Sequence, residues 1–399
     1  MNRRDFINKT TLIGTSASLF GGISQFALAQ KSHQIQSIKQ TGPLIIVFLR
    51  GGADGLGILS PLEDSNFISA RSPQLLFAPT ENPIFIAGTK LFWHPQASAF
   101  SELMLSGRLV PWLATGIINE TRSHFEAQEI IERGVSELHT LPDSMGLITK
   151  IAAGIMSPDS FLFAGGSNLP RAMQGNLSAI AIRDLQNGIQ FPGGVKNLAV
   201  LAQLANVDRA HPASEPIQKT LALLFNIQKY LDPSIKLDFN KIKPYESQGR
   251  TPYTNSDPSV GLRSIARLLN SNVPLQYAWV DHGGWDMHEG QPNRMNNTLN
   301  QLSQALKAFD EDLQAQQKKY TLVVLTEFGR RFRSNGSNGT DHGHGGLSLV
   351  IGSNLPKNKV MGYWPGIAEK DLNRGVDLAV TTPYQDVLNQ AMQWGHIEI

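Results

Sequence analysis

Two short glycine-rich segments hold the side chains best suited to chemistry. Their ionisable residues are Asp281, His282, Asp286, His288, Asp341, His342 and His344. Neutral imidazole and carboxylate groups are ligands that Zn²⁺, Mn²⁺ and related cations accept. Residues 275–280 before the first segment and 347–351 after the second are apolar runs typical of buried strands. Polar residues just past strand ends line the crevice of an open α/β sheet, so the pattern predicts a metal-dependent hydrolase.

The spacing inside these segments suits shared coordination. Asp286 and His288 are two residues apart, as are His342 and His344. From an irregular loop, both members of such a pair can turn towards one ion, or the second pair can serve two centres. The alternative is an ordinary turn whose polar groups are satisfied by hydrogen bonds.

Two further acids follow apolar runs. Asp54 comes after residues 44–49 and a Gly-Gly pair, and Glu327 comes directly after residues 321–326. A continuous apolar run indicates a strand buried on both faces, so both acids are expected at strand ends as metal ligands. For Asp54 the alternative is an Asx-turn residue. Arg330 is a candidate for binding an oxyanion of the substrate.

Residues 122–126 form a third candidate group. Ser123 and Glu126 have the spacing of a capping box, which predicts that Ser123 begins a helix. A helix N-terminus also suits an anionic substrate, so Ser123 is a candidate nucleophile with His124 beside it as a second catalytic residue. Arg122 is a candidate substrate-binding residue.

Strand-like and helix-like segments alternate, which predicts an α/β fold with a mostly parallel central sheet and helices on both faces. The expected strands are 44–49, 109–115, 160–164, 275–280, 320–325 and 347–351. The expected helices are 123–133, 217–231, 259–270, 297–314 and 383–394. Residues 232–258 lack periodicity and are expected to form a loop or insertion.

The N-terminus predicts export. Arg3 and Arg4 precede a mildly apolar stretch that ends in the small-x-small sequence Ala27–Ala29. This is the pattern of a twin-arginine signal peptide over residues 1–29, followed by a flexible lead-in over 30–42 and a single domain over 43–399. A membrane anchor is the alternative, but the stretch is too short and polar to span a bilayer. The expected location is the periplasm or the exterior, and the twin-arginine translocase is an expected partner.

Composition restricts the ligands and the partners. The chain has no cysteine, so neither a disulfide nor a thiolate ligand is available. Without Arg3, Arg4, Asp5 and Lys9, the remainder carries 32 basic and 32 acidic residues. Nothing in this balance favours a nucleic-acid or anionic-membrane partner.

The motifs resemble the bacterial family called domain of unknown function 1501. The matching segments are FLRGGADGL at 48–56, RSHFEAQ at 122–128, HGGWDMH at 282–288, TEFGRR at 326–331 and GTDHGHGG at 339–346. That family carries twin-arginine signals and is placed in the alkaline phosphatase and sulfatase superfamily. The resemblance implies an alkaline phosphatase-like three-layer sandwich with two metals at the carboxyl edge of the sheet.

The resemblance also implies roles for individual residues. Asp54 matches the first-strand aspartate ligand, and Ser123 falls near the position of the nucleophile. Asp286 and His288 match the later ligand pair, Glu327 matches the strand-end acid, and His342 or His344 matches the last histidine. Glu327-Phe328 stands where the superfamily usually has Asp-His, and the sulfatase signature is absent at Ser123.

Together these features predict an exported metal-dependent hydrolase of small anionic phosphate or sulfate esters. The full candidate ligand set is Asp54, Asp281, His282, Asp286, His288, Glu327, Asp341, His342 and His344. The expected cofactor is one or two divalent ions, Zn or Mn before Mg or Ca, and either Ser123 or a water attacks the ester. The alternatives are a secreted non-catalytic binding or scaffold protein and, among enzymes, a phosphomutase or transferase.

Overall fold

The computed structural model describes most of the chain after the N-terminal region. The described residues are 42–77, 82–137, 145–153, 160–176, 178–189, 194–207, 211–232, 243–353 and 355–395. The predicted signal peptide, and the lead-in except Gly42, lie outside these ranges. Within the described part of the chain, no helix combines the length and apolar character that a membrane crossing requires.

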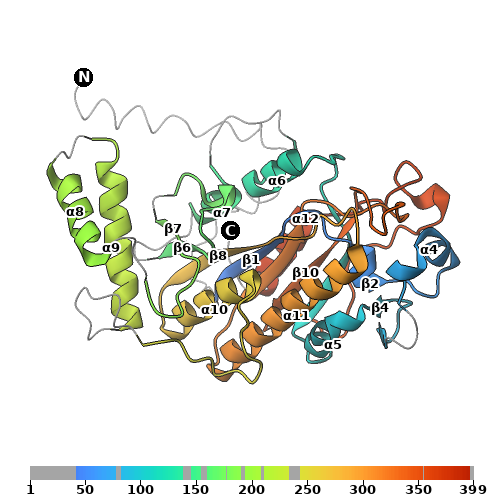
Figure 1. Ribbon diagram of the computed structural model, residues 1–399, viewed down its shortest axis with the longest axis horizontal. Helices are drawn as coiled ribbons and strands as arrows, with labels where there is room; N and C mark the ends of the chain where they lie inside the picture. Colours follow the sequence, from blue (N-terminus) through green and yellow to red (C-terminus); the bar gives the residue numbers. More distant parts are fainter. Residues whose placement is uncertain are drawn as a thin grey trace, which may run out of the picture.

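An eight-stranded sheet forms the centre of the fold, in the order β11-β5-β10-β9-β1-β8-β6-β7 (Figure 1). Its strands are β1 (Leu44–Leu49), β5 (Leu109–Gly116), β6 (Phe161–Ala164), β7 (Ala179–Ala181), β8 (Leu275–His282), β9 (Thr321–Thr326), β10 (Gly346–Gly352) and β11 (Thr382–Pro383). β10 is antiparallel to β5 and β9, and every other described pairing in this sheet is parallel. The mostly parallel sheet expected from the sequence is confirmed.

Helices cover both faces of this sheet. Because successive strand residues point to opposite faces, Ile45 and Val47 join one apolar core while Ile46 and Phe48 join the other. The first core packs against α5 (Ser98–Leu105), α10 (Asp257–Asn270) and α11 (Gln291–Ala315). The second packs against α6 (His124–Arg133), α7 (Leu147–Ala152) and α12 (Tyr384–Trp394). The result is the expected three-layer α/β sandwich.

Smaller elements attach to this sandwich. A three-stranded sheet consists of β2 (Leu59–Ser60), β4 (Phe92–Trp93) and β3 (Ile84–Phe85) in that order. Beside it lie the short helices α3 (Gly55–Ile58) and α4 (Ser65–Ala70), and α8 (Gly194–Val207) packs with α9 (Ser214–Leu231) as a pair at one end of the molecule (Figure 1). The described part of the predicted 232–258 loop has no helix or strand before α10 begins at Asp257.

Candidate metal centre

Three neighbouring strands end at the same level, and the loops that follow them carry residues of the candidate site. β1, β8 and β9 are parallel, with Leu49 opposite His282 on one side and opposite Thr326 on the other. β10 is antiparallel to β9, so the segment before its first residue, Gly346, reaches the same edge. The loops that carry the predicted ligands therefore meet at the carboxyl edge of the sheet.

Two glycines allow these loops to touch. Gly51 has a φ of +118°, and a Cβ there would lie 2.3 Å from the backbone nitrogen of Asp286. A Cβ on Gly339 would lie 2.2 Å from the carbonyl oxygen of His288. Since backbone atoms fill both spaces, only glycine fits. The first approach places Asp286 beside the loop after β1, and the second brings the segment of Asp341 against His288.

Arg330 fixes the carboxylate of Asp286. Its buried guanidinium donates to Asp286 Oδ1 at 2.6 Å. It also donates to the carbonyl oxygens of Gly51, Gly52, Trp285 and Thr340. Burial opposes ionisation of Asp286, but the hydrogen bond and charge of Arg330 outweigh it and lower the pKa of Asp286 to about 2. Arg330 thus holds an ionised carboxylate in place, and its N–H groups are committed to the protein.

His342 is oriented by a backbone carbonyl. Its Nδ1 lies 2.8 Å from the carbonyl oxygen of Arg122. A carbonyl only accepts, so Nδ1 carries the proton and Nε2 of the neutral ring carries the lone pair. Burial lowers the pKa of His342, which favours this neutral form. Nε2 is therefore the atom available to a metal.

His288 and His124 are oriented by carboxylates. Nδ1 of His288 lies 3.0 Å from Asp341 Oδ1, and Nδ1 of His124 lies 2.9 Å from Glu327 Oε1. The hydrogen bond from His288 lowers the pKa of Asp341. Burial opposes ionisation of Glu327, yet the hydrogen bond from His124 and others hold its pKa below the ordinary value. Such carboxylate–imidazole pairs are typical of histidines that bind metal through the opposite nitrogen.

The three Nε2 atoms converge on Asp286. Those of His288 and His342 lie 2.9 and 3.2 Å from Asp286 Oδ1, and that of His124 lies 3.6 Å from Oδ2. Among the described residues, ligand atoms of His124, Asp286 and His342 fall within 4.8 Å of one another. Atoms bound tetrahedrally at about 2.1 Å to one ion lie about 3.4 Å apart. The spacing of the ligand atoms of His124, Asp286 and His342 is compatible with donors around a single cation.

The three rings are hydrogen-bonded through Nδ1, which leaves their Nε2 atoms available to a cation. The Nε2 atoms of His288 and His342 lie 2.9 Å apart, although each ring offers a lone pair there when neutral. Nε2 of His124 is buried and has no hydrogen-bond partner among the described residues. A metal ion between His124, Asp286 and His342 would satisfy two lone pairs and one carboxylate, so this donor set fits a divalent cation. His288, whose Nε2 lies 2.9 Å from both Asp286 Oδ1 and His342 Nε2, is the candidate for a fourth donor. The side chains of Asp286 and His288 are 47% and 43% exposed, which leaves the centre open to solvent.

Two residues that the sequence analysis did not single out support this centre. Gln128 donates from Nε2 to Glu327 Oε1 at 3.1 Å, and Arg50 donates to the amide oxygen of Gln128 at 3.0 Å. The backbone N–H of Gly51 also donates to Glu327 Oε1, at 2.7 Å. Gln128 was detectable, because residues four apart on a helix share a face and His124 is four residues before it.

Four predicted ligands lie in other environments. Asp54 is buried and accepts hydrogen bonds from Arg71 and Gln291. Asp281 accepts from Trp279 Nε1 at 2.8 Å and from Arg50 Nε at 3.0 Å. The remaining two are the buried histidines His282, whose Nδ1 accepts from Trp285, and His344, which bonds to the carbonyl of Ile117 and to Asn373.

The segment before α6 has a structural role. Ser123 is the N-cap of α6, and its hydroxyl accepts from the backbone N–H of Glu126 at 3.4 Å, as the capping pattern predicts. The Arg122 guanidinium pairs with Glu120 and Asp377, while the backbone carbonyl of Arg122 orients His342.

Of the residues predicted from the sequence, the structure brings together His124, Asp286, His288, Glu327, Arg330, Asp341 and His342.

A family model described as a protein of unknown function (DUF1501) matches residues 166–392, more than half of the 399-residue chain. The chain belongs to the DUF1501 family. The family that the motifs indicate is thus confirmed. The matched range contains Asp286, His288 and His342, while His124 precedes it. DUF1501 is a family of unknown function, so membership assigns no activity.

Solved structures with detectable similarity to this DUF1501 chain are distant. They include an alkaline phosphatase from the Antarctic bacterium TAB5, a protein of the alkaline phosphatase superfamily from Vibrio parahaemolyticus, and Ps i-CgsB in complex with k-i-k-neocarrahexaose. Their identities are 10%, 12% and 8%, and their TM-scores are 0.35, 0.35 and 0.40. The matches cover 90%, 81% and 90% of this chain and 100%, 62% and 73% of theirs. The search of curated proteins gives no match.

Proposed function

We propose that this DUF1501 protein is an exported hydrolase that uses one divalent metal ion to cleave a small phosphate or sulfate ester. The ion is held by Nε2 of His124, His288 and His342 and by the carboxylate of Asp286. The convergence of three imidazoles on one carboxylate supports this, because each ring is anchored through Nδ1 and presents only Nε2. His124, a catalytic candidate in the sequence, becomes a ligand in this proposal.

The donor set also favours particular metals. Three nitrogens and one carboxylate suit Zn²⁺ or Mn²⁺ better than Mg²⁺ or Ca²⁺, which prefer oxygen ligands. A bound ion would polarise the ester and make a coordinated water more acidic. The remaining chemistry belongs to the chain: Arg330 keeps Asp286 ionised, and Glu327 and Asp341 hold two rings in the binding tautomer.

The N-terminus of α6 supports an anionic substrate. His124 is the first residue of this helix, so the free N–H groups and the positive end of the helix dipole lie beside the proposed ion. Both would stabilise negative charge on a transferred phosphoryl or sulfuryl group. Two attacking groups are open to test: the Ser123 hydroxyl and a water. The observed cap to Glu126 favours the water.

One structural feature favours the alternative of a non-catalytic metal-binding protein. Two arginines beside candidate acids, Arg71 and Arg330, are committed to Asp54 and Asp286. No free guanidinium from this pair remains to clamp a substrate anion, as many phosphoryl-transfer sites require. The two functions share the metal but differ in turnover.

The test combines metal content with hydrolysis. Protein exported and purified without chelator should contain one Zn or Mn per chain by elemental analysis. EDTA treatment should abolish cleavage of one member of a panel of aryl phosphates and aryl sulfates, and Zn²⁺ or Mn²⁺ should restore it. Asp286→Asn and His342→Ala should lose metal and activity together. Asp281→Asn is the matched control, since this carboxylate lies in the same segment but bonds to Trp279 and Arg50.

The outcomes separate the candidates. Metal bound at one per chain without turnover on any ester would support the binding protein and overturn the hydrolase. A folded wild-type protein that binds neither Zn²⁺ nor Mn²⁺ would overturn both.

A further inference from the structure

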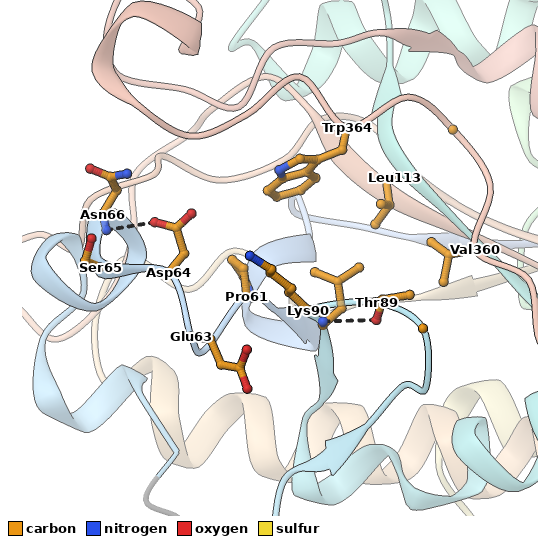
Figure 2. Close-up of a pocket in the computed structure, with 13 residues that line it drawn as sticks. Pro61, Glu63, Asp64, Ser65, Asn66, Thr89, Lys90, Leu113, Val360 and Trp364 are labelled. Carbon is orange, nitrogen blue, oxygen red and sulfur yellow. Dashed lines mark hydrogen bonds between the residues drawn. The ribbon is translucent and has the colours of Figure 1, made fainter.

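A second cavity lies between the two sheets and has no residue in common with the proposed metal centre (Figure 2). Its volume is about 600 Å³, within the size range of small-molecule sites. One side is built by the turn after β2 and the start of α4, and by the turn between β3 and β4. The opposite side comes from β5 and the segment 360–364, which is hydrogen-bonded along β5 through Met361.

One wall of this cavity is apolar and carries an aromatic ring. Trp364 lies across the cavity from Pro61 and Lys90, with Leu113 and Val360 beside it (Figure 2). The indole is half-buried and packs against the first apolar core. The segment that carries Trp364 is fixed to β5, because the backbone N–H of Leu113 donates to Met361. The backbone segment that carries the ring is therefore fixed beside the cavity.

The facing wall carries polar groups with unused bonding capacity. Asp64 caps α4 with Oδ1 alone, by accepting from the N–H of Asn66 at 2.8 Å. Glu63, Asn66 and Lys90 are exposed. Among the described residues, no ion pair joins Lys90 to either acid. The Asp64 carboxylate and the Lys90 ammonium thus face a flat apolar ring on the other wall (Figure 2), with Glu63 and Asn66 at the rim.

We infer that this cavity binds a neutral carbohydrate, with one sugar ring stacked on Trp364 and its hydroxyls bonded to Asp64 and Lys90. A pyranose has an apolar C–H face and a rim of hydroxyl groups, and this pairing of an indole with carboxylate and ammonium groups is complementary to both. The two acids outnumber the single lysine, so the lining disfavours phosphate- or sulfate-bearing ligands.

The test is equilibrium binding to the metal-loaded, full-length protein. An array of neutral oligosaccharides identifies the preferred sugar, and isothermal titration with that sugar gives its Kd. Trp364→Ala should weaken binding about tenfold or more, the loss expected when a central aromatic contact is truncated. Trp364→Phe should retain most of the affinity because a flat ring remains, and Asp64→Asn, which keeps an acceptor for the cap of α4, should weaken binding by several-fold.

Two controls make the result specific to this cavity. Tyr363→Ala removes the neighbouring aromatic, which is 73% exposed and does not line the cavity, and should leave Kd unchanged. His342→Ala, which removes a proposed metal ligand, should also leave Kd unchanged. Adenosine monophosphate and tetramethylammonium serve as probes for a nucleotide and a cationic ligand.

Several outcomes overturn the inference. These are no binding to any neutral saccharide on the array, binding that Tyr363→Ala weakens as much as Trp364→Ala, and tighter binding of either comparison probe than of every sugar. Circular dichroism of each variant distinguishes loss of the site from loss of the fold. Because the inference does not use the metal, failure of ester hydrolysis leaves it standing.

Discussion

Asp54 and Arg71 form a buried two-point ion pair, with Nη1 2.5 Å from Oδ2 and Nη2 3.0 Å from Oδ1. Gln291 donates to the same carboxylate at 2.6 Å. Burial opposes ionisation of Asp54, but the charge and hydrogen bonds of Arg71 outweigh it and hold the pKa of Asp54 below its ordinary value. The position that the family resemblance assigns to a metal ligand thus already has a cation, supplied by the protein. This relationship favours one metal over two.

The first prediction concerns this pair. Asp54→Asn should leave one metal per chain, while the free energy of unfolding falls by about 3 kcal/mol or more because Arg71 stays buried without its partner. Elemental analysis and urea denaturation measure the two quantities. Asp54→Asn with Arg71→Met is the matched control, since it removes the stranded charge and should recover part of the stability. A drop from two metals to one in Asp54→Asn would instead restore Asp54 as a ligand.

The second prediction concerns the carboxylate behind His124. Glu327→Gln should weaken Zn²⁺ binding about tenfold or more, the usual effect of removing a partner that orients a ligand. The amide keeps the shape of Glu327 but lacks the charge that strengthens its hydrogen bond to Nδ1 of His124. Competition with a chromophoric chelator measures the affinity. Glu126→Gln changes an acid on the same helix as His124, but this acid accepts a hydrogen bond from Thr121, so the substitution should leave the Zn²⁺ affinity unchanged. Equal effects of the two substitutions would contradict a specific role for Glu327.

Local pattern was sufficient for most of the larger elements of the fold, although the 14-residue helix α8 was not among the expected helices. The run at 44–49 coincides with β1, and the expected helix at 123–133 differs from α6 by one residue at its start. These segments have strong apolar periodicity or a capping signal. The elements β2, β3, β4 and β11 have two residues each. β2 and β11 pair with β4 and β5, strands so far away in the sequence that no local window contains both partners.

The sequence predicted the residue types of the candidate site, but it identified only some of the residues that converge there. Asp286, His288 and His342 lie in the predicted segments and converge, whereas His282 and His344 have the same chemistry in the same segments and do not. What separates them is the partner of each ring, such as Trp285 for His282 or Asn373 for His344. Such partners depend on tertiary packing, so spacing alone does not distinguish a ligand from a buried histidine.

The third prediction concerns pH and two buried histidines outside the candidate metal centre. Burial lowers the pKa of both His94 and His282 to about 4, and Nδ1 of each accepts a hydrogen bond in its neutral form. The folded state therefore binds fewer protons than the unfolded state between pH 4 and 6.5, the ordinary pKa of a histidine side chain. Stability should be full above pH 6.5 and fall as pH decreases towards 4, by about 3 kcal/mol for each histidine.

Denaturation at a series of pH values tests whether the stability falls as the pH decreases. His282→Gln removes one titrating group, so its stability curve should be flatter than that of the wild type between about pH 4 and 6.5. The exposed His211 provides the control substitution, His211→Gln, which should leave the slope unchanged. Parallel curves for wild type and His282→Gln would contradict the assignment.

The fourth prediction concerns export, which rests on the sequence alone. The paired arginines Arg3 and Arg4 and the Ala27–Ala29 site predict twin-arginine translocation with cleavage after Ala29. Arg3→Lys with Arg4→Lys should leave the precursor in the cytoplasm, as followed by fractionation and immunoblotting. Lys9→Arg is the matched control because it keeps the charge and leaves the pair intact. Mature protein outside the cytoplasm at the wild-type level in the double variant would contradict this route.

The last prediction separates two roles of Ser123. As an N-cap it should contribute about 1 kcal/mol of stability, and glycine should replace it better than alanine. As a nucleophile it should be essential to turnover, whatever its effect on stability. Because the hydroxyl accepts from the N–H of Glu126, we expect Ser123→Gly and Ser123→Ala to retain hydrolysis of the ester that the wild type cleaves, with Ser123→Ala the less stable.

Denaturation and steady-state kinetics of these two variants, both loaded with metal, decide the matter. If turnover disappears in both while the fold and the metal content remain, Ser123 attacks the substrate and the cap is secondary. If turnover persists, the attacking group is a water, and catalysis depends on the four proposed ligands and the groups that orient them. Either result fixes the nucleophile, because Ser123→Gly removes the hydroxyl while preserving most of the cap.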